Sequence, residues 1–480
     1  MLMSRMTKLN LGIVILITSA VMSGMLWLGR IDQDFFSYYY IGQGILKGKD
    51  MYKDFFENKG PVAYGFFAGL AAVFGREYGW AVVAASSLLD ATTVFFGWLV
   101  IKEWTKGIDD REDNKWWWVE AIAATAIYKS VSIGNFMGGV YTETIAMGGL
   151  MVSFWLLEKR RYKWSGVLFA LAVLTRQTIL FFVVAIAVRM WQKKTRKDEF
   201  LGWLGGLVVT GGVIVGWIWK AGSLGYMIEN MITTSLAYSE ASKHLVLINL
   251  VYRFAYETRL LFFMLLITVS AAVTVMKKQP SSKKIGFLAL VASSVLATFV
   301  GGIFYFHHFV QMMPVLGMSY ILRPKNKVLQ MLFGWIGVFA VMWVGVGFLI
   351  YVFDSDSEID NLQSAAPVIE EMRNKKYMVS VPFFPRLYID YGLPAPDAYF
   401  FPGWILKELD LPNREIHLQR HLGLEEEKLR ETLFLMVYRS EREKVEVDSY
   451  IKDVGSRFRI VKRNDYVFGD AKIEVWESEL

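Results

Sequence analysis

Long apolar runs separated by short basic clusters are the feature that most limits how this chain can fold. Hydrophobic residues make up 54% of the sequence. The first run, residues 9–28, matches the ~20 residues that a transmembrane helix needs. No small-residue cleavage site follows it, so we expect a retained helix and not a signal peptide. Similar runs continue to about residue 352, and they predict a mainly α-helical, multi-spanning membrane protein.

The basic clusters predict which side of the membrane each loop faces, because Lys and Arg concentrate in cytoplasmic loops. The clusters are Arg5–Lys8, Lys102–Lys115, Lys159–Lys163, Lys193–Lys197, Lys277–Lys284 and Arg323–Lys327. If all are cytoplasmic, an even number of crossings separates each neighbouring pair. We therefore expect about 11 transmembrane helices, with the N-terminus cytoplasmic and the C-terminus outside. The crossings fall at about 9–29, 80–101, 116–133, 142–157, 200–219, 257–276, 285–303, 309–322 and 328–352, with two short ones inside 164–191.

Two segments are too short for full crossings. A crossing at residues 62–74 would make the number of crossings between the first two basic clusters odd. We therefore expect an interfacial or re-entrant helix there on the external side. Residues 164–191 lie between two basic clusters, where two full crossings would need about 40 residues. This segment must form a short hairpin whose polar turn brings Arg176 to membrane depth. An arginine is tolerated there only beside water or an anion.

The composition changes after residue 352. Residues 353–480 contain 18 Lys and Arg against 25 Asp and Glu, which leaves 34 against 20 in residues 1–352. The basic excess thus belongs to the membrane loops and needs no nucleic acid to explain it. Short β-like runs occur at 377–382, 433–438, 458–461 and 472–476, with acidic helical stretches at 367–374 and 424–432. We expect a transmembrane domain in residues 1–352 and a small extracytoplasmic α/β domain in residues 353–480.

The long first external loop, residues 30–79, carries most of the polar residues that suggest chemistry. Asp32 and Asp34 follow the first apolar run, an aromatic segment ends at Gly48, and residues 57–61 read ENKGP. In this order they resemble the first external loop of the GT-C glycosyltransferases, membrane enzymes that take sugars from polyprenyl-phosphate carriers. Protein O-mannosyltransferases and aminoarabinose transferases are of this type, and the latter read EKPP where this chain has ENKGP. The resemblance reaches about residue 314 and includes GGIFYFHHFVQMMP, residues 301–314.

The resemblance implies an inverting transfer of a hexose or pentose from a polyprenyl-phosphate donor to an acceptor hydroxyl on the extracytoplasmic side. Asp34 would act as the base, and Lys59 with Arg176 would stabilise the departing phosphate. Glu143, at the external start of the crossing at 142–157, would orient the base, bind a divalent metal or hydrogen-bond a sugar hydroxyl.

The other candidates have secondary roles. Glu57 would hold Lys59 in place or ligate a divalent metal. His307 and His308 would bind the phosphate, or His308 would join Glu57 at a metal, although a metal site normally needs three or four ligands. Asp32 is a candidate helix cap. Plain structural explanations stand beside these roles: capping for acids at helix starts, a solvated ion pair for Glu57 with Lys59, and an interfacial polar pair for the histidines.

Two other functions fit the composition. A transporter or lipid flippase would have a similar helix count, but it would spread ionisable residues through several crossings and carry no dedicated external domain. Alternatively, the membrane part is a mere anchor for residues 353–480, which leaves the hairpin with Arg176 unexplained. The glycosyltransferase interpretation places the protein in the plasma membrane. Its partners there would be the lipid bilayer, a polyprenyl-phosphate-linked sugar, and a glycan, lipid or protein acceptor.

Overall fold

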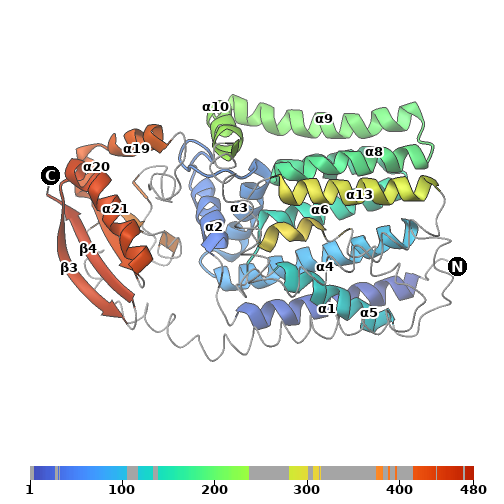
Figure 1. Ribbon diagram of the computed structural model, residues 1–480, viewed down its shortest axis with the longest axis horizontal. Helices are drawn as coiled ribbons and strands as arrows, with labels where there is room; N and C mark the ends of the chain where they lie inside the picture. Colours follow the sequence, from blue (N-terminus) through green and yellow to red (C-terminus); the bar gives the residue numbers. More distant parts are fainter. Residues whose placement is uncertain are drawn as a thin grey trace.

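Helices make up most of the computed structural model, with one small sheet near the C-terminus (Figure 1). The structure describes residues 5–27, 31, 33–104, 117–132, 139–236, 281–300, 306–312, 314, 375–381, 388–389, 395–396, 414–438, 441–468 and 471–479. Asp32, the expected crossings at 257–276 and 328–352, and the expected helix at 367–374 lie outside these residues.

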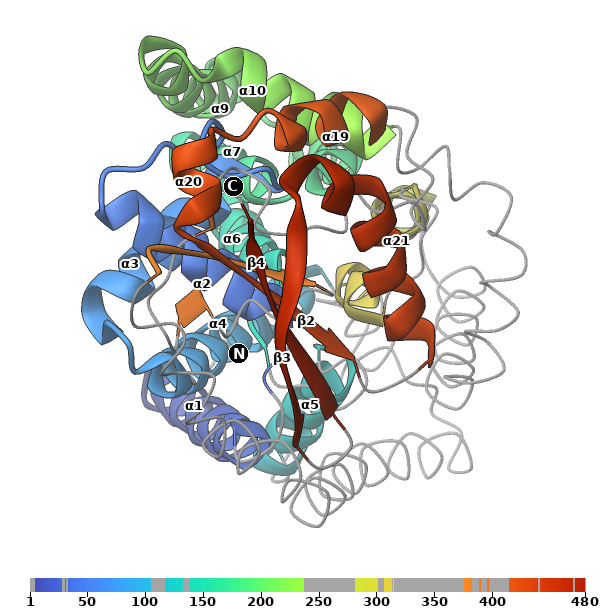
Figure 2. The ribbon, with the colours of Figure 1, turned by 90° about the vertical axis from the view of Figure 1, so that its left-hand side faces the viewer.

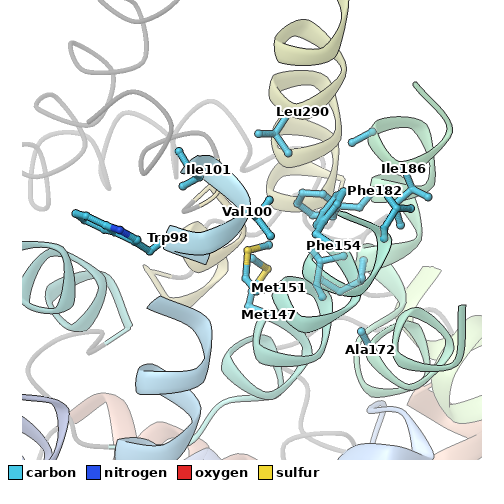
Figure 3. Close-up of a cluster of buried hydrophobic side chains, with 14 of the residues drawn as sticks. Trp98, Val100, Ile101, Met147, Met151, Phe154, Ala172, Phe182, Ile186 and Leu290 are labelled. Atoms are coloured by element: carbon cyan, nitrogen blue, oxygen red, sulfur yellow. The ribbon is translucent and has the colours of Figure 1, made fainter. Parts of the chain in front are cut away.

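A bundle of helices forms the larger part of the described chain, and its members run along the longest axis of the molecule (Figure 1). They are α1 (Arg5–Trp27), α4 (Tyr78–Trp104), α5 (Trp117–Ser132), α6 (Thr142–Glu158), α7 (Tyr162–Thr175), α8 (Val183–Gln192), α9 (Lys197–Lys220) and α13 (Ser281–Phe299). Apolar side chains from facing helices fill the core. Figure 3 shows where Val100 of α4, Met151 of α6, Leu290 of α13 and Phe182, the residue before α8, converge.

The short hairpin has the form that the sequence predicts. Helix α7 ends at Thr175, and the 3-10 helix η2 (Gln177–Phe182) leads into α8. Arg176 lies between them in an extended conformation, with φ −143° and ψ 113°. A second 3-10 helix, η5 (Phe306–Met312), occupies the region where the sequence predicts a crossing to begin.

A layer of short helices lies between the bundle and the C-terminal sheet (Figure 1). It contains α2 (Gln33–Leu46), α3 (Pro61–Phe74), α10 (Leu224–Ile228) and the π-helical turn η3 (Glu229–Thr233). Gly48, at φ +83°, adopts the left-handed conformation that commonly follows a helix, just beyond α2. Pro61 is the first residue of α3, where its missing N–H costs no hydrogen bond.

Two described helices, α4 and α9, are long and apolar enough to cross a membrane. Shorter apolar stretches include Lys8–Gly24, Pro61–Phe74, Tyr162–Thr175, Gln177–Gln192 and Lys284–Thr298. The helical fold class with a small sheet is therefore confirmed. The number of crossings stays a prediction.

The C-terminal part is a four-stranded sheet covered by helices. Its strands are β1 (Tyr377–Val381), β2 (Thr432–Tyr438), β3 (Ile460–Phe468) and β4 (Ala471–Ser478), in the order β1-β2-β4-β3. Strands β1 and β2 pair in parallel, and the other two described pairs are antiparallel. Figure 2 shows α19 (Arg414–Leu422), α20 (Glu426–Arg430) and α21 (Glu441–Phe458) around these strands, with α2 and α3 behind them.

One sequence prediction in this domain is wrong at its start. The run at 458–461 is predicted to be a strand, but Phe458 ends α21 and β3 begins at Ile460. Helix α21 is highly charged, and its buried side chains Val447, Tyr450, Val454 and Phe458 recur only at helical spacing. Because its apolar residues are not consecutive, no continuous apolar run marks this helix in the sequence.

A buried ion pair lies inside the bundle, and no local sequence pattern points to it. Lys129 Nζ of α5 lies 2.8 Å from Asp90 Oδ2 of α4, and their side chains are 3% and 2% exposed. The ammonium also donates hydrogen bonds to Ser86 of α4 and to Ser23 of α1. Three helices thus share one satisfied polar contact.

We predict that Lys129→Met destabilises the protein by about 3–5 kcal/mol, because the Asp90 carboxylate would stay buried without a cation. Adding Asp90→Leu should recover most of this loss. Lys376→Met is the matched control, since the Lys376 side chain is 69% exposed in its pair with Glu431 and such exposed pairs contribute little to stability. Denaturant unfolding in detergent measures all three variants. Equal losses in the two Lys→Met variants would contradict the assigned role.

Candidate functional site

The candidate site lies where the first loop meets the ends of α6 and α7. Asp34 occupies the first turn of α2, and Tyr38 follows one turn later on the same face. The Tyr38 hydroxyl lies 3.4 Å from Asp34 Oδ2 and can donate a hydrogen bond to it. Sequence reasoning missed Tyr38, although its spacing of four residues from Asp34 on a helix could have pointed to it.

Tyr38 is buried among negative charges. Burial, followed by the charges of Asp34, Glu57 and Glu143, raises the pKa of Tyr38 well above its usual value. The phenol therefore stays protonated and acts as a donor. All three carboxylates therefore lie close enough to act electrostatically on one hydroxyl, and Asp34 also lies within hydrogen-bond distance of it.

The segment before α3 holds one cation over this ring. Lys59 Nζ lies 5.9 Å from the centre of the Tyr38 ring, 3.4 Å from Glu57 Oε1 and 2.6 Å from Asn58 Oδ1. Its backbone is fixed on both sides, since the Lys59 N–H donates to Tyr64 Oη and the Tyr52 hydroxyl donates to the Lys59 carbonyl.

Glu57 itself is nearly inaccessible, with 7% of the residue exposed. Burial raises the pKa of its carboxyl, and the nearby Lys59 and the Asn58 N–H oppose this rise. The plain explanation of a solvated ion pair is therefore wrong for Glu57 and Lys59, because the carboxylate is withdrawn from water.

A second cluster joins α6, α7 and η5. Arg176 Nη2 lies 2.9 Å from Glu143 Oε1 and 2.9 Å from His308 Nε2. Since a guanidinium only donates, His308 Nε2 is the acceptor of this contact. His308 Nε2 also lies 3.4 Å from Glu143 Oε1. The side chain of Glu143 is 1% exposed, so it is a buried counter-ion of the partly buried Arg176 and not only a first-turn acid.

Gly60 brings the two clusters together. A Cβ built on Gly60 would lie 1.9 Å from the Leu174 carbonyl oxygen and 3.0 Å from that of Thr175. The backbone after Lys59 therefore touches the last turn of α7, directly before Arg176. Only a glycine allows this approach.

Of the predicted site residues, the structure gathers Asp34, Glu57, Lys59, Glu143, Arg176 and His308. His307 lies in η5, but its side chain and the whole of Asp32 are outside the described residues.

The geometry bears on two sequence-based expectations. The sequence requires water or an anion beside Arg176, and Glu143 supplies a carboxylate there, as Glu57 does for Lys59. Within the described residues, moreover, no three His, Asp or Glu side chains are grouped closely enough to hold a metal ion. The pairing of Glu57 with His308 at a metal therefore has no geometric support.

The cluster offers a carboxylate, Asp34, hydrogen-bonded to Tyr38, together with two cations whose counter-ions belong to the protein. This arrangement can accept a proton and can bind an anion if the cations shift from their carboxylates. No protein-family model matches the chain, and no curated protein sequence matches it. The geometry is thus the main support for any functional proposal.

We predict that Gly60→Ala destabilises the protein by about 1–3 kcal/mol, because the new methyl group would overlap the Leu174 carbonyl. Gly65→Ala is the matched control, since nothing lies within 4 Å of its added Cβ in the middle of α3. That control should leave stability unchanged or raise it by about 0.5–1 kcal/mol. Thermal unfolding compares the two. A similar loss in both would show that the close approach of Gly60 to α7 is not tight.

Proposed function

We propose that this protein is a multi-spanning membrane glycosyltransferase that transfers a sugar from a polyprenyl-phosphate donor to an acceptor hydroxyl on the extracytoplasmic side. The observation that carries the proposal is the placement of Asp34 and Lys59, both from the first loop, in one cluster with Arg176 from the end of α7. The resemblance of the first loop to GT-C enzymes supplies the type of reaction.

In the proposed reaction Asp34 accepts the proton of the acceptor hydroxyl as its oxygen attacks the anomeric carbon from behind. A new C–O bond forms, and the bond between the anomeric carbon and the phosphate oxygen breaks with its electron pair on that oxygen. The donor phosphodiester carries one negative charge and the released polyprenyl phosphate carries up to two. Lys59 and Arg176 stabilise this added charge, which exists only as the reaction proceeds.

The membrane setting has its own support. Helix α9 exposes apolar side chains along its length, with Val208 60%, Val209 65% and Val213 66% exposed. Exposed apolar surface of this kind is typical of lipid contact. In the proposed topology, the donor lipid enters sideways from the bilayer and residues 353–480 lie outside the cell membrane.

A transporter or flippase is a second candidate because of one observation. Asp90 of α4 and Lys129 of α5 form a buried ionisable pair between these two bundle helices, and such pairs often mark ion or proton pathways. Reconstituted vesicles can separate the two functions: movement of polyprenyl-phosphate sugar across the membrane without covalent transfer would favour the flippase.

We expect Asp34→Asn to lower sugar transfer by on the order of a hundredfold or more, because the amide keeps the shape but cannot accept the proton. Purified protein is offered radiolabelled polyprenyl-phosphate hexoses and pentoses, and the labelled product is counted. Donor binding and thermal stability should stay near wild type. Asp198→Asn, an exposed acid on α9, is the control and should transfer normally. Activity of Asp34→Asn within a few-fold of wild type would remove the base from this position.

Lys59→Ala and Arg176→Ala should each weaken donor-lipid binding and turnover. The double variant should lose less than the sum of the two losses, because both cations act on one phosphate. Arg176→Lys should rescue only in part, since a single ammonium cannot grip two oxygens in a planar fork. Equilibrium binding of the donor lipid measures this cycle. Strictly additive losses would place the two cations on separate groups.

A further inference from the structure

The C-terminal domain and the first loop are joined at two consecutive phenylalanines that point into different cores. Phe55 is 1% exposed and packs with side chains of α2 and α3. Phe56 is 4% exposed and belongs to the core of the C-terminal domain, together with Leu418, Leu424 and Leu429. The very next residue is Glu57, the carboxylate paired with Lys59.

Tyr40 of α2 makes three further contacts between this segment and the C-terminal domain. The Tyr40 hydroxyl of α2 accepts a hydrogen bond of 2.8 Å from the Ala395 N–H. The Tyr40 ring also lies 5.2 Å from that of Tyr388 and 5.6 Å edge-on from that of Phe55. Tyr40 is two residues after Tyr38, so the C-terminal domain contacts the helix that carries the candidate base.

The contact at η3 completes this attachment. Asn230, 1% exposed, donates a hydrogen bond to the Phe55 carbonyl. Its neighbour Glu229 lies 2.9 Å from Arg420 of α19. The Phe55 carbonyl is therefore fixed by Asn230, whose neighbour Glu229 contacts the C-terminal domain. The Phe56 ring is fixed by the core of that domain itself.

We propose that the C-terminal domain is a positioning element of the candidate site, and that Phe56 is the positioning residue through which it acts. The core of the domain receives Phe56, which sets the backbone of residues 57–60. That backbone in turn places Glu57 and Lys59 beside Tyr38. The small external domain then has a specific role, because without it a loop with glycines at both ends, Gly48 and Gly60, would have many conformations to lose.

Amide hydrogen exchange tests the proposal without any assumption about the reaction. The Asn58 N–H is bonded to Glu57 Oε1 and the Lys59 N–H to Tyr64 Oη, so both should be protected in the wild-type protein. In Phe56→Ala these two amides should exchange at least about tenfold faster. Phe56→Leu fills most of the space that the Phe56 ring occupies in this core, and it should restore the protection. Val454→Ala is the matched control, because Val454 is buried in the same core but belongs to α21.

The activity measurement rests on the proposed function. Phe56→Ala should lower transfer by about tenfold to a hundredfold, because small misplacements of catalytic groups have effects of that size. Phe56→Leu should recover most of it, and Val454→Ala should stay within a few-fold of wild type. If wild type transfers no sugar, the proposed function fails while the exchange measurement still decides the positioning role. Unchanged exchange in folded Phe56→Ala, or an equal increase in Val454→Ala, would overturn the inference.

Discussion

The ion pair between Arg176 and Glu143 joins the end of α7 to the start of α6, where the carboxylate has lost almost all contact with water. Removing either partner would leave a buried charge without compensation, which costs several kcal/mol. This requirement holds two helix ends together, and His308 of η5 adds a third element. The first loop can then rest on α7, because Gly60 allows its backbone to touch the Leu174 carbonyl.

The site that results is close to charge balance. Asp34, Glu57 and Glu143 are gathered near the Tyr38 hydroxyl, and Lys59 and Arg176 lie beside Glu57 and Glu143. Internal pairing keeps the cations in place without a ligand. An incoming anion must compete with these carboxylates for the two cations. The same pairing explains why so many ionisable groups can lie together in a poorly hydrated place.

The three parts of the molecule depend on one another. The bundle provides the ends of α6 and α7, the first loop provides Asp34 and Lys59, and the C-terminal domain receives Phe56 from that loop. Successive residues of β2 face opposite sides of the sheet. Leu433 and Leu435 belong to the apolar cluster shared with α2, whereas Phe434 and Met436 belong to the cluster around α21. The sheet therefore has one face completed by its own helices and one completed toward the first loop.

Local sequence patterns were enough to predict the helical class, because long apolar stretches can be satisfied only as helices that bury or shield their backbone. They also predicted the hairpin at Arg176, the helix that begins at Pro61 and the strand at 433–438, since basic flanks, a proline and a short β-like run are local signals. The polar contacts between distant helices carry no such signal. Nothing in the local pattern links Asp90 with Lys129, Glu143 with Arg176, or Phe56 with the core of the C-terminal domain. These contacts follow from the three-dimensional packing, because the partner of a buried charge or ring depends on which helix ends and loops the whole chain brings to the same place.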